Sequence, residues 1–370
     1  MTQIHRVPTP PSRGAAPHPL TVAATAVDDA AMLAEYGHDD FAESARSRTV
    51  RLFGSDHGRL LLWVALPDGV DPEACRPEDA LGMASVALML QEDTDKAQVF
   101  ITTHPDHRGR GVGRALLDAL TPDLLGRGRT TWLAYAYTPG PSATGPDAIA
   151  ARSGVGAVDG RRPAHRWLVQ EGFTLEQCER PSTLTLDADT LRRAEALAEQ
   201  ARSAAPGASE YEMVGWSDRT PEEYLTDLGW LISRMSTDVP MAELDLDEQV
   251  WDAERVRGLE ERTALGGIHW VITAARHVPT GRLTAFTRFE WPEENPAGVW
   301  QEETLVLAEH RGHRLGMLVK AANLARLVAV NPEARRAHTW NAVENDWMLA
   351  INDALGFVPV GLEGAWQKKF

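Results

Sequence analysis

The chain has 370 residues, of which 43% are hydrophobic and 24% are charged, the balance of a folded protein with two or three domains. Its 37 Lys and Arg residues against 53 Asp and Glu residues give a formal net charge of −16. That charge argues against nucleic acid or an anionic membrane surface as the main partner. Two cysteines, Cys75 and Cys178, cannot build a disulfide framework, so we expect a reducing, cytoplasmic environment.

The first half of the chain is predicted to form a short tail and then alternating strands and helices. Residues 1–17 are rich in proline and contain no apolar run, so we expect a flexible tail rather than a signal peptide or an anchor. We then predict strands at 60–66, 83–90 and 98–102, a helix at 112–120, a strand at 131–137 and a helix at 163–171.

The second half begins after a linker. An Ala-rich helix is predicted at 187–202, and the break at Pro206 and Gly207 places the boundary between the halves at 187–208. Next we predict a strand at 211–214, helices at 221–235 and 245–264, strands at 269–275, 282–291 and 303–307, a helix at 316–328, a strand at 337–341 and a helix at 345–354. The expected fold class is therefore α/β (α+β), with two tandem domains at 18–186 and 209–370, each a mixed, mainly antiparallel sheet flanked by helices.

A repeat relates the two halves. The string His-Arg-Gly-x-x-x-Gly occurs at 107–113 and again at 310–316, 203 residues later, and each copy follows an apolar run. A Gly-Phe pair after a helical stretch occurs at 172–173 and at 356–357, 184 residues later. The first half therefore holds about 19 extra residues, which we place in the Gly- and Pro-rich stretch 138–160. That stretch could be a lid or a plain surface loop.

A strand that runs into a glycine loop and then a helix creates a binding site for anions. Glycines let the backbone approach a ligand closely, and the first N–H groups of the helix point outward with the positive end of its dipole. The motif follows three strands and lacks Gly-Lys-Ser/Thr, so neither a Rossmann fingerprint nor a nucleoside-triphosphate loop fits. One copy could be a simple tight turn, but two copies in equivalent places favour a phosphate site.

In these glycine motifs the chain resembles the GNAT superfamily of acyl-CoA-dependent N-acetyltransferases. Its hallmark, Arg/Gln-x-x-Gly-x-Gly/Ala, is complete at Arg108, Gly111 and Gly113, whereas the second copy has Arg314 in place of one glycine. A second family signature ends in Leu-Gly-Phe and matches 345–357, with Asn352 where the family has tyrosine. The first half keeps only the Gly-Phe ending of that signature.

The resemblance implies direct attack of an amine on the thioester of acetyl-CoA, whose arm would lie along the strand before the glycine loop. Backbone N–H groups of that strand would polarise the thioester carbonyl. In the first half, the implied cofactor contacts are Ile101, Thr102, Arg108, Gly109, Arg110, Gly111, Val112, Gly113 and Arg114. In the second half, they are Leu305, Val306, Leu307, Arg311, Gly312, His313, Arg314, Leu315, Gly316, Asn341 and Asn345.

The attacking amine must lose a proton, so a base is needed near the thioester. Glu302 and Glu303 are the best-placed candidates, although either could be a solvated charge at a strand end. Asn352 cannot donate a proton as tyrosine does, so another group or water must serve, or this half binds without catalysing. Asn345 could hydrogen-bond the cofactor arm, cap a helix, or do both.

Each half keeps a different part of the family's motifs: the first has the complete glycine motif, and the second matches the late signature more fully. We expect catalysis in the second half, with the first as a CoA-binding or structural copy. The alternatives are catalysis in the first half and a catalytically degenerate acyl-CoA-binding protein.

The expected partner is a small-molecule amine that carries positive charge, and the expected assembly is a monomer or homodimer. The acidic residues of the early second half would attract such an amine, or they form a solvated helix face: Glu243, Asp245, Asp247, Glu248, Asp252, Glu254, Glu260 and Glu261. Six tryptophans could line a pocket or belong to the core: Trp230, Trp251, Trp270, Trp300, Trp340 and Trp347. No metal site is expected, because the histidines lack ligand spacing.

Overall fold

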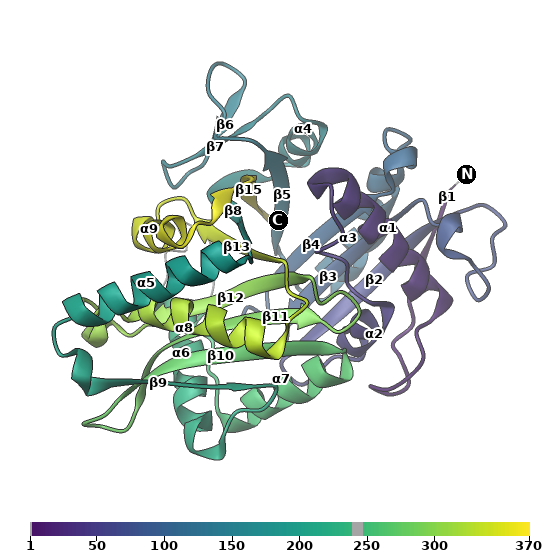
Figure 1. Cartoon of the computed structure of the whole chain (residues 1–370). Helices are drawn as coiled ribbons and strands as arrows, with labels where there is room; N and C mark the ends of the chain where they lie inside the picture. Colours follow the sequence, from purple (N-terminus) through teal and green to yellow (C-terminus); the bar gives the residue numbers. More distant parts are fainter. Residues whose placement is uncertain (1, 239–246) are drawn as a thin grey trace.

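The computed structural model describes residues 2–238 and 247–370 (Figure 1). The first half contains β1 (Thr2–Arg6), α1 (Pro19–Tyr36), α2 (Ala45–Phe53), β2 (Gly58–Pro67), β3 (Gly82–Met89), β4 (Lys96–Thr103), α3 (Val112–Gly126), β5 (Thr131–Pro139), β6 (Ala148–Ala150), β7 (Ala157–Asp159), α4 (Pro163–Gln170) and β8 (Thr174–Thr185). The second contains α5 (Ala188–Ala204), β9 (Tyr211–Ser217), α6 (Leu225–Asp238), α7 (Ala253–Leu265), β10 (Ile268–His277), β11 (Leu283–Pro292), β12 (Gly298–Val306), α8 (Leu315–Val330), β13 (Arg336–Ala342), α9 (Asp346–Leu355), β14 (Val358–Pro359) and β15 (Gly361–Lys369).

Two expectations about individual elements are wrong. Residues 2–6 are not a flexible tail, because they form β1, which pairs antiparallel with β2 before the first proline of the segment. The predicted helix at 245–264 begins only at Ala253, because the side chain of Asp252 accepts a hydrogen bond from the N–H of Arg255 and caps α7 there. The extra residues of the first half include the short β6–β7 hairpin.

One continuous sheet joins the two halves. Its strand order is β1-β2-β3-β4-β5-β15-β8-β13-β12-β11-β10-β9, with β14 paired to β8. The β4–β5 and β12–β13 pairs are parallel, and the other neighbouring pairs are antiparallel. The last strand of the chain, β15, thus lies between two strands of the first half, and β8 pairs with β13 of the second half.

Helices cover both faces of this sheet. We call the face that carries α1, α2, α6 and α7 the front face; apolar residues of these helices pack there on β2 in the first half and on β10 and β11 in the second. The back face carries α3, α4, α5, α8 and α9. The front-face helices of the two halves touch, because the guanidinium of Arg46 on α2 donates to the carbonyl of Leu265 on α7 at 2.7 Å. Among the described helices, none combines the length and hydrophobicity needed to span a bilayer.

The strand β15 carries a large part of the first half's core. Trp366 on β15 is only 1% exposed and belongs to the same buried cluster as Leu116 of α3 and Trp132 of β5. The first half therefore needs the C-terminal strand in order to close its own core.

We predict that Trp366→Ala lowers the free energy of unfolding by about 3–5 kcal/mol, because it leaves a cavity in a core built from both ends of the chain. Urea unfolding followed by circular dichroism measures the change. The matched control is Trp347→Ala, since Trp347 is 88% exposed on α9 and its loss should be nearly neutral. Equal stability of the two variants would contradict this role of β15.

Candidate active site

The two glycine loops follow the same backbone path. Gly109 has φ +76° and Gly312, at the equivalent place, has φ +86°. Before each helix stands another left-handed residue, Gly111 with φ +81° in the first half and Arg314 with φ +54° in the second. A side chain disfavours this region of backbone space, so Arg314 adopts it at a cost that glycine would avoid. The shape of the loop is therefore kept although one glycine is missing.

Both loops lead into helix N-termini that can hold an anion. The first backbone N–H groups of α3 and α8 have no partner within their helices. A Cβ added at Gly113 would meet only ordinary contacts, the nearest at 3.7 Å, whereas at Gly316 it would press on the tip of Ile351 at 3.0 Å. The residues expected to bind a diphosphate thus lie at two helix starts: Gly111 and Gly113 are at least partly exposed, whereas Leu315 and Gly316 are buried.

The basic side chains around these loops are partly engaged. Arg108 and Arg110 are exposed, but Arg114 forms an ion pair with Glu171 at 2.8 Å. In the second loop, Arg311 donates to the carbonyl of Val306 at 3.3 Å, and His313 is hydrogen-bonded to the carbonyl of Pro206 at 2.6 Å. The linker before β9 is therefore hydrogen-bonded to the second loop.

A wedge opens beside each loop where two parallel strands separate. The strands β4 and β5 pair only over 96–98 and 131–133, and β12 and β13 pair only over 298–300 and 336–338. In the first half, the N–H of His104 donates to the carbonyl of Leu81, directly before β3, and alternation along an antiparallel ladder directs the N–H of Thr102 to β3. The N–H of Ile101 therefore faces the wedge, where a thioester carbonyl could accept it.

The second half repeats this arrangement and adds a β-bulge. The N–H of Leu307 donates to β11, so that of Leu305 points the same way and that of Val306 faces the wedge. Further back on β12, Glu302 and Glu303 together oppose a single residue of β11, which is the geometry of a bulge. The corresponding register of β3 and β4 is unbroken from 82–87 to 98–103.

The bulge holds a cluster of charges on the front face. Both guanidinium contacts of Arg288 to Glu303 are 3.0 Å, and a third reaches Glu290 at 3.4 Å. Burial and the neighbouring carboxylates raise the pKa of Glu302, which Arg288 partly opposes. The side chain of Glu302 itself stays open to solvent. It is therefore an accessible carboxylate whose neighbouring carboxylates favour its protonated form, and no hydrogen bond or ion pair ties it within the described residues.

The second-half asparagines lie on the back face. Asn352 is 1% exposed and donates its amide to Asn341 at 2.6 Å, so it fastens α9 to β13 rather than facing open space. Asn345 caps α9 by accepting from the N–H of Met348 at 3.2 Å. A buried lysine that the sequence analysis did not single out, Lys320 on α8, lies 3.9 Å from the sulfur of Met348, and burial lowers its pKa to about 7.

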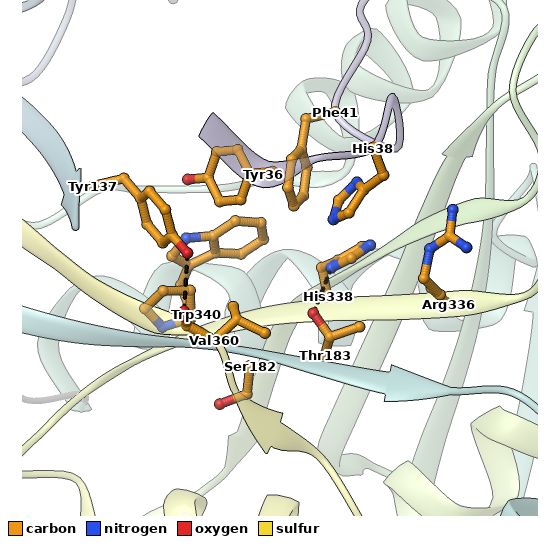
Figure 2. Close-up of a pocket in the computed structure, with 11 residues that line it drawn as sticks. Tyr36, His38, Phe41, Tyr137, Ser182, Thr183, Arg336, His338, Trp340 and Val360 are labelled. Carbon is orange, nitrogen blue, oxygen red and sulfur yellow. Dashed lines mark hydrogen bonds between the residues drawn. The ribbon is translucent and has the colours of Figure 1, made fainter. Parts of the chain in front are cut away.

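A pocket of about 180 Å³ opens on the front face between the two halves (Figure 2). The first half contributes the end of α1, the connection to α2, and Tyr137, and the second half contributes β13. Of the six tryptophans considered as pocket residues, Trp340 lines it. The lining residues are Tyr36, His38, Phe41, Tyr137, Pro181, Ser182, Thr183, Arg336, His338, Trp340 and Val360.

A buried carboxylate beside this pocket ties the halves together. Asp40 is fully buried and accepts from the guanidinium of Arg336 at 2.5 and 2.6 Å and from His338 at 2.7 Å. These bonds hold the pKa of Asp40 well below its usual range. The ligand atoms of His38, Asp40 and His338 lie within 4.8 Å of one another, as in a metal site. The paired Arg336 already occupies both oxygens of Asp40, so we interpret the group as a hydrogen-bonded clamp.

Some acidic residues of the early second half bind other segments of the chain, whereas Glu248, Glu254 and Glu261 are exposed. Asp247 accepts from the N–H of Asp93 at 2.9 Å and lies 3.8 Å from the amine of Lys96. Glu260 accepts from the N–H of Thr220 at 2.8 Å. Glu243 and Asp245 lie outside the described residues.

We predict that Asp40→Asn lowers the free energy of unfolding at pH 7 by about 2–3 kcal/mol, because Arg336 loses its charged acceptor. The folded-state pKa of Asp40 is depressed, so its contribution is complete above the unfolded value near pH 4 and is lost as pH falls further. Urea midpoints of wild type and variant should therefore converge in acid. Asp39→Asn, at an exposed neighbour, is the control. A constant difference down to pH 2 would contradict the clamp.

Comparisons with known proteins agree with this geometry. Residues 31–140 match the Acetyltransferase (GNAT) family. A tandem GNAT protein from the clavulanic acid biosynthesis pathway is similar over 99% of this chain and 98% of its own, with 25% identity and a TM-score of 0.72. A GCN5-related N-acetyltransferase from Sphaerobacter thermophilus covers 99% and 95% of the two chains, with 13% identity and a TM-score of 0.55. The comparison with curated proteins gave no match. The resemblance to the GNAT superfamily and the tandem fold are thus confirmed.

Proposed function

We propose that the chain transfers the acetyl group of acetyl-CoA to the amine of a small molecule, and that the C-terminal half performs the reaction. The GNAT family match supports acyl transfer in general. The observation that carries the choice of half is the bulge of β12, which brings carboxylates to the rim of a wedge beside an anion-binding loop. A bulge commonly re-aims a side chain next to an active site, and β4 has none against β3.

The residues of the second half fit the cofactor. Acetyl-CoA supplies the activated thioester. The N–H groups at the start of α8 would hold its diphosphate, and the positive φ of Arg314 gives the loop the same turn that Gly111 gives the first. The N–H of Val306 would polarise the thioester carbonyl from the wedge. The structure of the tandem GNAT protein from the clavulanic acid biosynthesis pathway is one without acetyl-CoA.

Among the two expected bases, Glu302 suits the task better than Glu303. Arg288 engages both carboxylate oxygens of Glu303, whereas Glu302 is open to solvent. The raised pKa of Glu302 brings it nearer to the working pH, which favours proton acceptance from an ammonium group. Asn352 is buried and cannot donate a proton, so water would protonate the departing thiolate.

A second candidate function is binding of acyl-CoA without turnover. It is favoured by the burial of Asn352 at the place of the family tyrosine. Catalysis in the N-terminal half is a further alternative, because its loop has the complete set of glycines.

The choice of half predicts the outcome of two matched substitutions. Gly113→Asp and Gly316→Asp place a carboxylate at the same position of each helix start, where it repels a diphosphate. We expect Gly316→Asp to reduce acetyl transfer to amines by at least about 100-fold and Gly113→Asp to leave it within about threefold. Thiol release from acetyl-CoA measures turnover, and melting temperatures check that both variants fold. Loss of turnover in Gly113→Asp alone would move the reaction to the first half.

We further predict that Glu302→Gln lowers kcat/KM by about 10²–10⁴-fold, because a positioned base is lost. Since a base must be deprotonated, the wild-type rate should fall as pH is lowered through the raised pKa of Glu302, and the variant should lack this limb. The control is Glu294→Gln, at an exposed position of the preceding turn. An unchanged pH profile in Glu302→Gln would exclude this residue as the base.

A further inference from the structure

We propose that the pocket between the halves binds the acceptor, and that the acceptor is a primary amine carried on a single aromatic ring. This inference rests on the proposed function and names the substrate class of the same reaction. Four observations carry it: the size of the pocket, its lining, its place beside the wedge of the second half, and the charges around it.

The size and lining of the pocket suit one ring. A closed apolar cavity of about 150 Å³ holds benzene, so about 180 Å³ accommodates a six-membered ring with a short chain. Tyr36 and Phe41 lie with ring centroids 4.5 Å apart, and Phe41 lies 5.4 Å from Trp340. Figure 2 shows Tyr36 and Phe41 next to Trp340 and His338, and the ring centroids of Phe41 and His338 lie 4.6 Å apart. These rings contact one another and form an aromatic wall of the pocket, against which a guest ring can make offset or edge contacts.

The pocket adjoins the wedge where the proposed reaction takes place. His338 is paired with Trp300 at the last contact between β13 and β12, and the strands diverge beyond it. Trp340 stands two residues further along β13, on one rim of the wedge, and Glu302 stands two residues beyond Trp300, on the other. The indole N–H of Trp300 donates to the carbonyl of Asp40 at 3.1 Å, so the wedge and the pocket share a wall.

The charges near the pocket favour an ammonium group. Glu363 on β15 lies directly across from Tyr137 on one side and Glu179 on the other. Burial raises the pKa of Glu363 to about 8 and that of Glu179 to about 7, and neither forms an ion pair within the described residues. The one arginine of the lining, Arg336, is neutralised by Asp40. Because the raised pKa values keep both carboxyls largely protonated near neutral pH, a nearby ammonium group gains by favouring their ionised forms.

The pocket also gives the first half a role in the reaction of the second. Tyr36 and Phe41 belong to the first half but lie over β13, held there by the clamp of Asp40. Substitutions in the first half should therefore change the choice of acceptor without changing the affinity for acetyl-CoA.

The test uses the full chain with 2-phenylethylamine and n-pentylamine as acceptors. We expect kcat/KM for 2-phenylethylamine to be about tenfold higher, and Phe41→Leu and Trp340→Leu each to raise its KM about tenfold with the KM of acetyl-CoA unchanged. Trp347→Leu, at an exposed position outside the pocket, is the control. Phe41→Leu keeps an apolar side chain, and its melting temperature shows whether the fold is intact.

Turnover tests the proposed function, and binding tests the pocket assignment separately. If neither amine is acetylated, the proposed function is overturned, and calorimetric titration of 2-phenylethylamine into wild type and Phe41→Leu then decides the pocket alone. Binding that is lost in Phe41→Leu supports the pocket assignment. Turnover that does not distinguish the two amines, or binding that is equal in wild type and both pocket variants, overturns it.

Discussion

The place of β15 in the sheet is the constraint on which the rest of the structure depends. All nine residues of this strand pair with β5, and its other edge pairs with β8, so the C-terminus fills the gap between two strands of the first half. Because β15 occupies that place, the far edge of β8 is free to pair with β13. The halves consequently share one hydrogen-bonded sheet, and neither can shift without breaking backbone pairs.

This fixed arrangement allows each half to reach across the front face of the other. From the first half, Asp40 reaches Gly298 on β12. A Cβ added at Gly298 would lie 2.5 Å from the Cβ of Asp40, so only glycine fits at that position. In the other direction, Asp247 and Asp93 exchange backbone-to-carboxylate bonds at 2.8 and 2.9 Å, and Arg255 pairs with Glu92. The crossings are polar, and Asp40, Asp93 and Arg255 are buried, so their geometry is specific and costly to disturb.

The sequence predicted what depends on local chemistry and not what depends on long-range pairing. The glycine loops, the cap of α9 at Asn345 and the strands and helices around them follow from short motifs, and the structure contains them. The sequence does not predict the strand at 2–6, because the nearby prolines indicate disorder and the partner strand lies some 60 residues away. The pocket and the clamp of Asp40 with Arg336 join residues 296 apart, and no local pattern announces such a contact. The bulge at Glu302 is likewise a property of the register between two strands.

The two loops show how far the halves have diverged within one fold. Arg314 adopts the left-handed backbone that glycine provides at the equivalent position, so the path of the second loop survives a substitution that opposes it. Strain of this kind persists only where surrounding structure enforces it. The first half keeps an unstrained loop but has no bulge against β3 and no carboxylate on its wedge strand. The first half instead places the aromatic side chains of Tyr36 and Phe41 over β13 of the second half. On the proposed function, the first half contributes to the reaction through its fold and its reach across the sheet, and its own wedge need not be catalytic.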